Sequence, residues 1–130
     1  MKRLPMLAVV LLCSPAFAEP FSAEHLVRLD RVGSPALSPD GMQVVYPVRE
    51  TDMEADKGAY DLWLSPVAGG DARRLTRHEA SDTSPAWSTD GRFVYFLSKR
   101  GETTQVWRIA MAGGEAAPVT ALPLDVGTFR

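Results

Sequence analysis

The sequence predicts an all-β fold, namely a β-propeller fragment of about two four-stranded blades with a short N-terminal helix after a signal peptide. Residues 34–41 recur almost unchanged as residues 84–91, and both copies begin with Ser-Pro-Ala and end with Asp-Gly. Three further pairs of residues lie 44 positions apart: Trp63 and Trp107, Gly69 and Gly113, and Thr76 and Thr120. Repeats of about 40 to 50 residues with short strands and Gly-rich turns are typical of propeller blades.

The N-terminus has the pattern of an export signal. Two basic residues come first, residues 4–13 are apolar, and Ala16 and Ala18 form a small-x-small cleavage site. The apolar run is too short to span a bilayer as a helix. We therefore expect residues 1–18 to be a signal peptide, the protein to be exported to the periplasm or secreted, and no membrane anchor to remain after cleavage.

The single cysteine, Cys13, lies inside this predicted signal. Leu12 precedes it at a position where a lipid-anchored protein needs a small residue, so we do not expect a lipoprotein. The mature chain would then have no disulfide, no cysteine nucleophile and no cysteine metal ligand, although an oxidising compartment would permit disulfides.

The charge of the mature chain argues against nucleic acid as a partner. Removal of Lys2 and Arg3 from the 14 basic residues leaves 12 against 16 acidic ones, a formal net charge of −4. Phosphate binding requires a clustered basic surface, which this sequence lacks.

A short helix is expected in the lead-in segment, residues 19–31. Ser22 is suited to the N-cap, Glu24 lies in the first turn where the helix dipole favours an anion, and Leu26 and Leu29 share one face.

Two repeats follow, at residues 32–80 and 81–124, and residues 125–130 begin a third. In each repeat a Ser-x-Asp-Gly turn joins two strands, because Asp can cap backbone amides and Gly tolerates positive φ. A loop leads to a third strand, and Gly69-Gly70 or Gly113-Gly114 forms a two-residue hairpin turn before the fourth. The first repeat is six residues longer in its middle loop.

The residues of the repeat resemble the WD-like repeats of TolB-type propellers, and in particular the N-terminal propeller of exported bacterial peptidases of the prolyl oligopeptidase family. The shared motif is Ser-Pro-Asp-Gly, an aromatic residue, Leu-Trp, Gly-Gly and Leu-Thr. Three segments favour the peptidases: residues 21–32 as their lead-in, residues 96–107 as their second blade, and residues 122–127 as their linker between blades.

This resemblance implies a propeller that caps an α/β-hydrolase domain with a Ser-Asp-His triad and selects the peptides that reach it. Such a domain is marked by a Gly-x-Ser-x-Gly elbow, which this sequence does not contain. We therefore assign no catalytic, cofactor-binding or metal-binding residue, and expect the chain to be inactive alone. The alternative is a TolB-like periplasmic propeller that binds protein partners and has no enzymatic activity.

Neither the two histidines nor the acidic segment of the chain matches a catalytic or metal-site pattern. His25 and His78 have no patterned Ser, Cys or second His, so both are expected to be structural or exposed. The acidic residues 50–56 alternate like a calcium loop. However, Lys57 stands where an EF-hand that begins at Asp52 needs Gly, and Trp63 stands where it needs Glu. We expect a polar loop on the rim of the blade, a kind of loop that can line a substrate channel.

Three tryptophans would be enough for a stacking platform for sugars or bases, but their positions in the repeat favour a structural role. Trp63 and Trp107 occupy the same position in successive repeats, so we expect them to pack in the blades. Trp87 replaces Leu37 and is expected to pack between blades as well.

Overall fold

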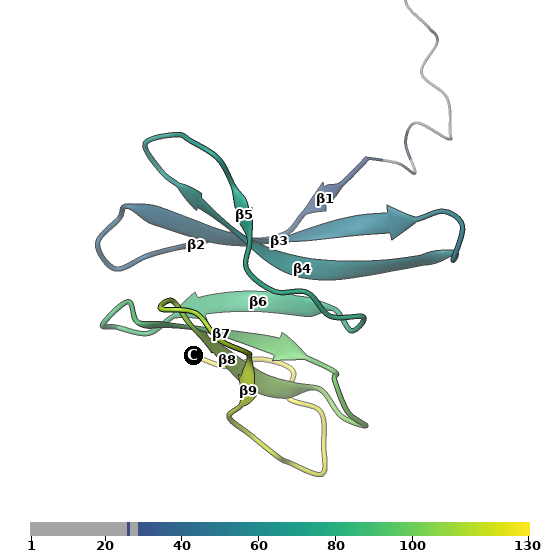
Figure 1. The fold of residues 1–130 in the computed structure, drawn as a ribbon. Helices are drawn as coiled ribbons and strands as arrows, with labels where there is room; N and C mark the ends of the chain where they lie inside the picture. Colours follow the sequence, from purple (N-terminus) through teal and green to yellow (C-terminus); the bar gives the residue numbers. More distant parts are fainter. Residues whose placement is uncertain (1–25, 27–28) are drawn as a thin grey trace, which may run out of the picture.

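The computed structural model describes residue 26 and residues 29–130. Its regular structure in this part of the chain is nine β-strands in two antiparallel sheets, which lie one above the other in Figure 1. This confirms the predicted all-β fold. The predicted signal peptide and nearly all of the predicted helix lie outside the described residues. Within the described ones, no helix is long and apolar enough to cross a membrane.

The first sheet, which we name the first blade, contains β1 (Arg31–Val32), β2 (Ala36–Leu37), β3 (Gln43–Asp52), β4 (Lys57–Pro66) and β5 (Arg73–Arg74). β1 and β2 both pair with β3, so they act together as the first of four strands. Gly33 lies between them and donates its N–H to the carbonyl of Pro47 at 2.7 Å. A Cβ at Gly33 would lie 2.6 Å from Pro47 Cγ, so this approach requires glycine.

The second sheet, or second blade, contains β6 (Asp82–Trp87), β7 (Phe93–Ser98), β8 (Gln105–Ala110) and β9 (Ala117–Pro118), in that spatial order. Its first strand has a register shift between Thr83 and Ala86, where Ser84 has a φ of 53°. The gap between β1 and β2 falls at the same position of the repeat. Both blades therefore have the same topology and the same irregularity in their first strand.

The Ser-Pro-Asp-Gly turn of the first blade is closed by two side chains. Ser38 donates its hydroxyl to Asp40 Oδ1 at 2.5 Å and accepts the N–H of Gln43 at 2.9 Å. Asp40 Oδ1 also accepts the N–H of Met42 at 3.0 Å. These bonds, first that from Ser38 and then that from Met42, lower the pKa of Asp40 because they favour its charged form. Gly41 takes the expected positive φ of 71°.

The second blade repeats this turn without the proline. Ser88 donates to Asp90 Oδ1 at 2.6 Å and accepts the N–H of Phe93 at 2.9 Å, and Asp90 Oδ1 accepts the N–H of Arg92 at 3.0 Å. Gly91 has a φ of 70°. The Ser, Asp and Gly residues are thus sufficient for the turn, and Thr89 replaces proline without changing it.

The loop before the last strand of each blade is longer than the two-residue hairpin turn that the Gly-Gly pairs predict. The chain turns at Gly69 and Gly113, whose N–H groups donate to the carbonyls of Pro66 and Ala110 at 3.2 and 3.1 Å. Strand pairing resumes only at Arg73–Arg74 and Ala117–Pro118. The prediction of two-residue loops was wrong because paired glycines with positive φ also suit a wider loop.

A threonine after each last strand continues the pairing. Thr76 Oγ1 accepts the N–H of Leu62 at 2.9 Å, and Thr120 Oγ1 accepts the N–H of Val106 at 3.0 Å. A side chain therefore replaces a backbone carbonyl at the same place in both blades, which explains why Thr recurs in the repeat.

The core lies between the two blades. One cluster joins Val45, Leu62 and Leu64 of the first blade with three residues of the second, Val94, Phe96 and Ile109. Val45, Leu62, Val94 and Phe96 have no exposed surface. Burial of each such side chain contributes roughly 1.5–3 kcal/mol, so this contact is the main stabilising interaction of the described part. Trp87 adds a hydrogen bond across it, from Nε1 to the carbonyl of Ala36 at 3.0 Å.

We predict that the Asp90→Asn substitution reduces the loss of stability in acid. The hydroxyl of Ser88 and the N–H of Arg92 hold the pKa of Asp90 well below its ordinary value of 3.8. A group with a lowered pKa in the folded state stabilises the protein above its ordinary pKa, and this stabilisation is lost as the pH falls below it. Urea unfolding of the complete gene product as a function of pH measures this slope below about pH 4.

Ser88→Ala provides the matched comparison for that prediction. It removes the interaction that lowers the pKa of Asp90 most, so its pH profile should lie between those of the wild type and Asp90→Asn. Identical profiles below about pH 4 for all three proteins would show that the turn does not have this role.

Candidate functional site

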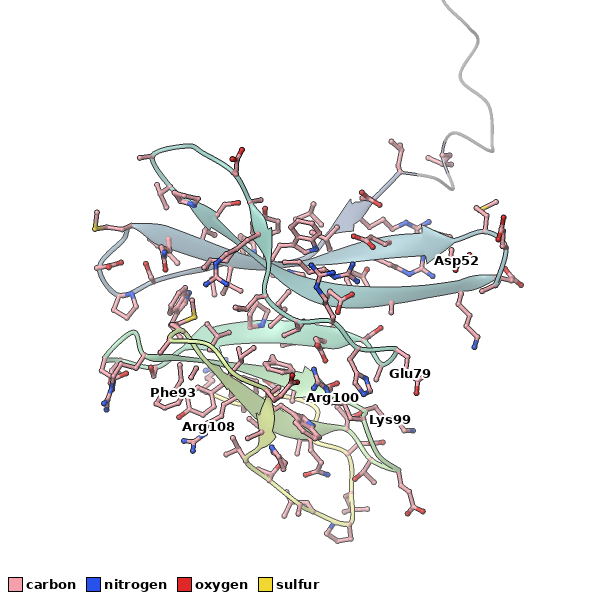
Figure 2. The ribbon with its side chains drawn as sticks, in the orientation of Figure 1. Asp52, Glu79, Phe93, Lys99, Arg100 and Arg108 are labelled. Atoms are coloured by element: carbon pink, nitrogen blue, oxygen red, sulfur yellow. The ribbon has the colours of Figure 1, made fainter. Side chains whose placement is uncertain are left out.

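The β3–β4 hairpin forms a rim at one end of the first blade. Its strands have ten residues each, whereas β7 and β8 have six each. At the tip, Asp52 Oδ1 accepts the N–H groups of Glu54 and Ala55, both at 3.0 Å. Figure 2 shows Asp52, Glu79 and Lys99 at this same end of the molecule. The extra residues thus form the polar rim loop that the sequence predicted.

The rim shows no arrangement that would hold a metal ion. Within the described residues, no group of three or more His, Cys, Asp or Glu side chains is placed for this purpose. The carboxylate of Asp52, which would begin a calcium loop, instead caps backbone N–H groups of its own turn.

At the base of the hairpin, Arg74 joins two carboxylates. It forms an ion pair with the buried Asp61 and another with Glu50 at 3.3 Å, and the hydrogen bond to Asp61 raises the pKa of Arg74. Asp61 Oδ1 accepts the N–H of His78 at 3.3 Å, and His78 Nδ1 accepts the N–H of Ala80 at 2.9 Å. His78 is therefore part of the linker between the blades, and His25 lies outside the described residues.

Gln105 takes the place of Asp61 in the second blade. Its Oε1 accepts the Thr120 hydroxyl at 2.7 Å and the N–H of Leu122 at 3.0 Å, and its Nε2 donates to the carbonyl of Leu124 at 3.2 Å. A buried polar side chain thus holds the linker in both blades. Sequence reasoning missed this position, although Asp61 and Gln105 lie 44 residues apart and so carry the spacing of the repeat.

Each blade has a pocket beside this linker. The pocket of the first blade, about 300 Å³, is charged, and its lining includes Glu50, Lys57, Asp61, Arg74 and Glu79. The pocket of the second blade, about 460 Å³, occupies the equivalent position, and its lining includes Gln105, Trp107, Ala121, Leu122 and Pro123. The same backbone site is therefore lined by several charged side chains in one blade and, besides Glu102, by uncharged polar and apolar side chains in the next.

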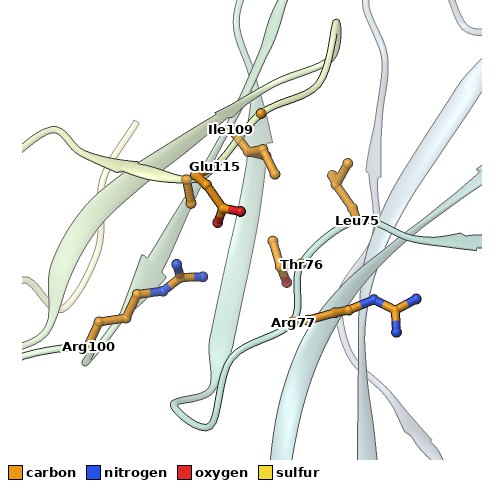
Figure 3. Close-up of a pocket in the computed structure, with 8 residues that line it drawn as sticks. Leu75, Thr76, Arg77, Arg100, Ile109 and Glu115 are labelled. Atoms are coloured by element: carbon orange, nitrogen blue, oxygen red, sulfur yellow. The ribbon is translucent and has the colours of Figure 1, made fainter.

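A buried ion pair lies at the junction of the blades. Asp82 has no exposed surface and pairs with Arg100 at 2.8 Å. The guanidinium of Arg100 also lies over the rings of Phe96 and Trp107, at 5.4 and 5.0 Å from their centres. Figure 3 shows Arg100 and Glu115 on the wall of a cavity of about 190 Å³ between the blades. Sequence reasoning also missed this pair, because the first repeat has no equivalent of it.

Two of the three tryptophans are structural in this arrangement. Trp87 and Trp107 both pack against the core cluster between the blades. Leu37, which occupies the position of Trp87 in the first repeat, is 59% exposed, so the two equivalent positions differ in burial.

Comparison with known families identifies the fold. The family model described as the TolB β-propeller domain, PD40, matches residues 26–124, which is most of the chain. The chain belongs to the TolB-type β-propeller family. This agrees with the two repeated sheets and with the resemblance of the repeat motif.

Two relatives of this TolB-type propeller are named as peptidases. The uncharacterized peptidase YuxL of Bacillus subtilis is 30% identical over 106 residues, which cover 81% of this chain and 16% of YuxL. Dipeptidyl-peptidase 5 of Porphyromonas gingivalis is 33% identical over 88 residues, which cover 68% of this chain and 13% of that protein. The chain thus spans a small part of the length of both relatives.

A solved structure supports the fold. The structure of the isopeptidase AtxE2 without ligand aligns with 85% of this chain and 22% of its own chain, with a TM-score of 0.66 and 24% identity. At this identity the likeness concerns the fold.

We predict that Arg100→Leu strongly destabilises this TolB-type propeller. The substitution leaves the buried charge of Asp82 without its partner, and loss of one partner of a buried ion pair costs about 3–5 kcal/mol. Arg100→Lys keeps the charge and should cost less, chiefly through weaker contact with the two aromatic rings. Urea unfolding of the complete gene product gives both values.

Arg92→Leu is the matched control, because Arg92 and Asp90 form an exposed pair at 2.7 Å. Exposed pairs contribute little to stability, so this variant should unfold like the wild type. If Arg100→Leu also unfolded like the wild type, the pair with Asp82 would have no structural role.

Proposed function

We propose that this chain is part of the N-terminal propeller of an exported serine peptidase of the prolyl oligopeptidase family. In this proposal the propeller restricts access to an α/β-hydrolase domain elsewhere in the same polypeptide. Its substrates are peptides, and folded proteins are excluded by the width of the channel. The chain itself supplies no catalytic residue, since it contains no Gly-x-Ser-x-Gly elbow.

One observation supports the proposal most. The chain belongs to a propeller family, and the two relatives described above are named as peptidases while the match covers only 16% and 13% of their length. Proteins of that length have room for a separate domain besides a propeller. The export pattern of residues 1–18 agrees with a peptidase that acts in the periplasm or outside the cell.

The rim hairpin gives the proposed role a structural basis. A propeller arranges its blades around a central channel, and the loops at its ends border the opening. The β3–β4 hairpin is four residues longer on each strand than its counterpart, β7–β8, and its tip carries Asp52 and Glu54. A long polar hairpin of this kind can narrow an opening without contributing to the chemistry.

The family description also supports a second function. The matching family model is named after TolB, and in this alternative the chain is part of a TolB-like propeller that binds protein partners in the periplasm. The two functions differ in one chemical property, because only the peptidase contains an activated serine.

Labelling of the complete gene product with a fluorophosphonate probe tests the proposal. We expect one serine of the complete product to be labelled, whereas residues 1–130 alone take no label because they have no nucleophile elbow. A complete product that takes no label, and whose sequence contains no elbow, would support the protein-binding alternative.

Shortening of the hairpin tests the selective role. Replacement of residues 52–57 by Asn-Gly keeps a turn compatible with two paired strands. We expect this variant to hydrolyse a dipeptide ester at the rate of the wild type and to gain activity on long peptides. Unchanged selectivity, in a variant that still takes the probe, would show that the hairpin does not limit access.

A further inference from the structure

The pocket of the second blade lies at the end of the molecule that carries the rim. Residues 101–103 of its lining belong to the β7–β8 hairpin, the counterpart of the β3–β4 hairpin. Figure 2 shows Lys99, in the loop of that hairpin, at the same end as Asp52. The volume of about 460 Å³ is that of a ligand pocket, for which about 300–1,000 Å³ is typical. The pocket is therefore placed and sized to bind part of a molecule that reaches the rim.

The polar side chains that line this pocket are already engaged in hydrogen bonds. Oε1 of Gln105 accepts the Thr120 hydroxyl and the N–H of Leu122. Its Nε2 donates to Thr103 Oγ1 at 2.8 Å and to the carbonyls of Leu122 and Leu124 at 3.0 and 3.2 Å. The Thr103 hydroxyl in turn donates to the carbonyl of Leu122 at 3.2 Å. Gln105, Thr103 and Thr120 therefore use every donor that they have and offer a ligand few polar contacts.

The rest of the described lining combines a carboxylate with apolar side chains. The carboxylate is that of Glu102, and the apolar side chains are those of Trp107, Ala121, Leu122 and Pro123. The indole nitrogen of Trp107 is buried and has no hydrogen-bond partner within the described residues, so the ring faces the pocket with carbon atoms. A ligand rich in hydroxyl groups would lose hydrogen bonds to water here without replacing them. The surface suits an apolar side chain instead.

The apolar wall is held in place by the rest of the second blade. Leu122 and Pro123 belong to the linker that the buried Gln105 fixes on both sides of the pocket wall. Trp107 lies in β8 and packs against the core cluster, and the guanidinium of Arg100 lies over its ring at 5.0 Å. A preformed pocket loses little conformational freedom on binding, so more of the apolar burial contributes to affinity.

The equivalent pocket of the first blade shows that a following blade does not fill this position of the repeat. That pocket remains open beside the second blade, and all of its lining lies within residues 50–79. Its chemistry differs because its linker residues are polar: His78 and Glu79 occupy the positions of Leu122 and Pro123, 44 residues later. Of the two pockets, that of the second blade is the one suited to an apolar group.

We infer that the pocket of the second blade binds an aromatic side chain of the peptide substrate at the rim. The rings of Trp107 and Pro123 give the pocket flat apolar surfaces, against which another ring packs well. The carboxylate of Glu102 repels an acidic residue beside that aromatic one. This inference rests on the proposed peptidase function, because in that function peptides pass the rim on their way to the hydrolase domain.

Binding of two dye-labelled peptides to the complete gene product tests the inference. The peptides have equal length and no net charge, and they differ only at the central residue, which is Phe in one and Ala in the other. Treatment with the fluorophosphonate probe beforehand prevents cleavage of the peptides. We expect the Phe peptide to bind about tenfold more tightly, because burial of one aromatic side chain is partly offset by the cost of ordering it. Fluorescence anisotropy gives both dissociation constants.

The Leu122→Asp and Leu124→Asp variants form a matched pair. Both side chains are exposed, at 53% and 75%, and the carbonyl of each residue accepts a hydrogen bond from Gln105. Only Leu122 belongs to the lining of the pocket. We therefore expect Leu122→Asp to abolish the preference for the Phe peptide and Leu124→Asp to retain it. Urea unfolding of both variants verifies that they are folded.

The outcomes separate this inference from the proposed function. A product that takes the probe but binds both peptides equally, or that keeps its preference in Leu122→Asp, would overturn the inference and leave the peptidase proposal intact. A product without a reactive serine would overturn the peptidase proposal. A preference that only Leu122→Asp removes in such a product would assign the pocket to a segment of a protein partner, and the assignment to a substrate would be wrong.

Discussion

Apolar packing between the two sheets is the interaction on which the rest of this structure depends. Each sheet has buried side chains on a face that neither could bury alone. Val45 and Leu62 of the first blade and Val94 and Phe96 of the second lose all their exposed surface in this contact. The hydrogen bond from Trp87 to Ala36 joins the two sheets, and the buried ion pair of Asp82 with Arg100 ties β6 to the end of β7 within the second. The polar groups therefore orient a contact that apolar burial stabilises.

Local features of the fold could be predicted from the sequence because the interacting residues are close in the chain. The Ser-x-Asp-Gly turns are closed by side chains within five residues of one another, so the motif itself predicts the geometry. The 44-residue spacing predicts the common topology of the two blades because the same residue types recur at the same positions of each repeat. The Gly-Gly pairs were less informative, because positive φ allows both the expected tight turn and the wider loop that the structure contains.

The polar contacts of the candidate site could not be predicted in the same way. Arg100 reaches Asp82 across 18 positions of sequence, and Arg74 reaches Asp61 across 13. Such pairs depend on strand register, which the composition of the chain does not reveal. Asp61 and Gln105 lie 44 residues apart, so the repeat spacing alone would have paired them. Because one is a carboxylate and the other an amide, their common role in holding the linker was not recognised. The rim pockets differ in charge as well: several charged side chains line that of the first blade, whereas, among the described residues, Glu102 is the one charged residue that lines that of the second, so successive blades present different surfaces on one backbone.

A double-mutant cycle across the two sheets tests most directly whether packing between blades organises the structure. Leu62→Ala and Phe96→Ala remove fully buried side chains from opposite sides of the same cluster. Urea unfolding of the complete gene product gives the free energies of unfolding of the two single variants and the double variant. The two substitutions should show a coupling energy of about 0.5–3 kcal/mol, as expected for residues in a shared core. Met42→Ala, at a side chain that is 68% exposed, should show no coupling with Leu62→Ala. Strict additivity of Leu62→Ala and Phe96→Ala would contradict the account, because the two sheets would then be stabilised independently.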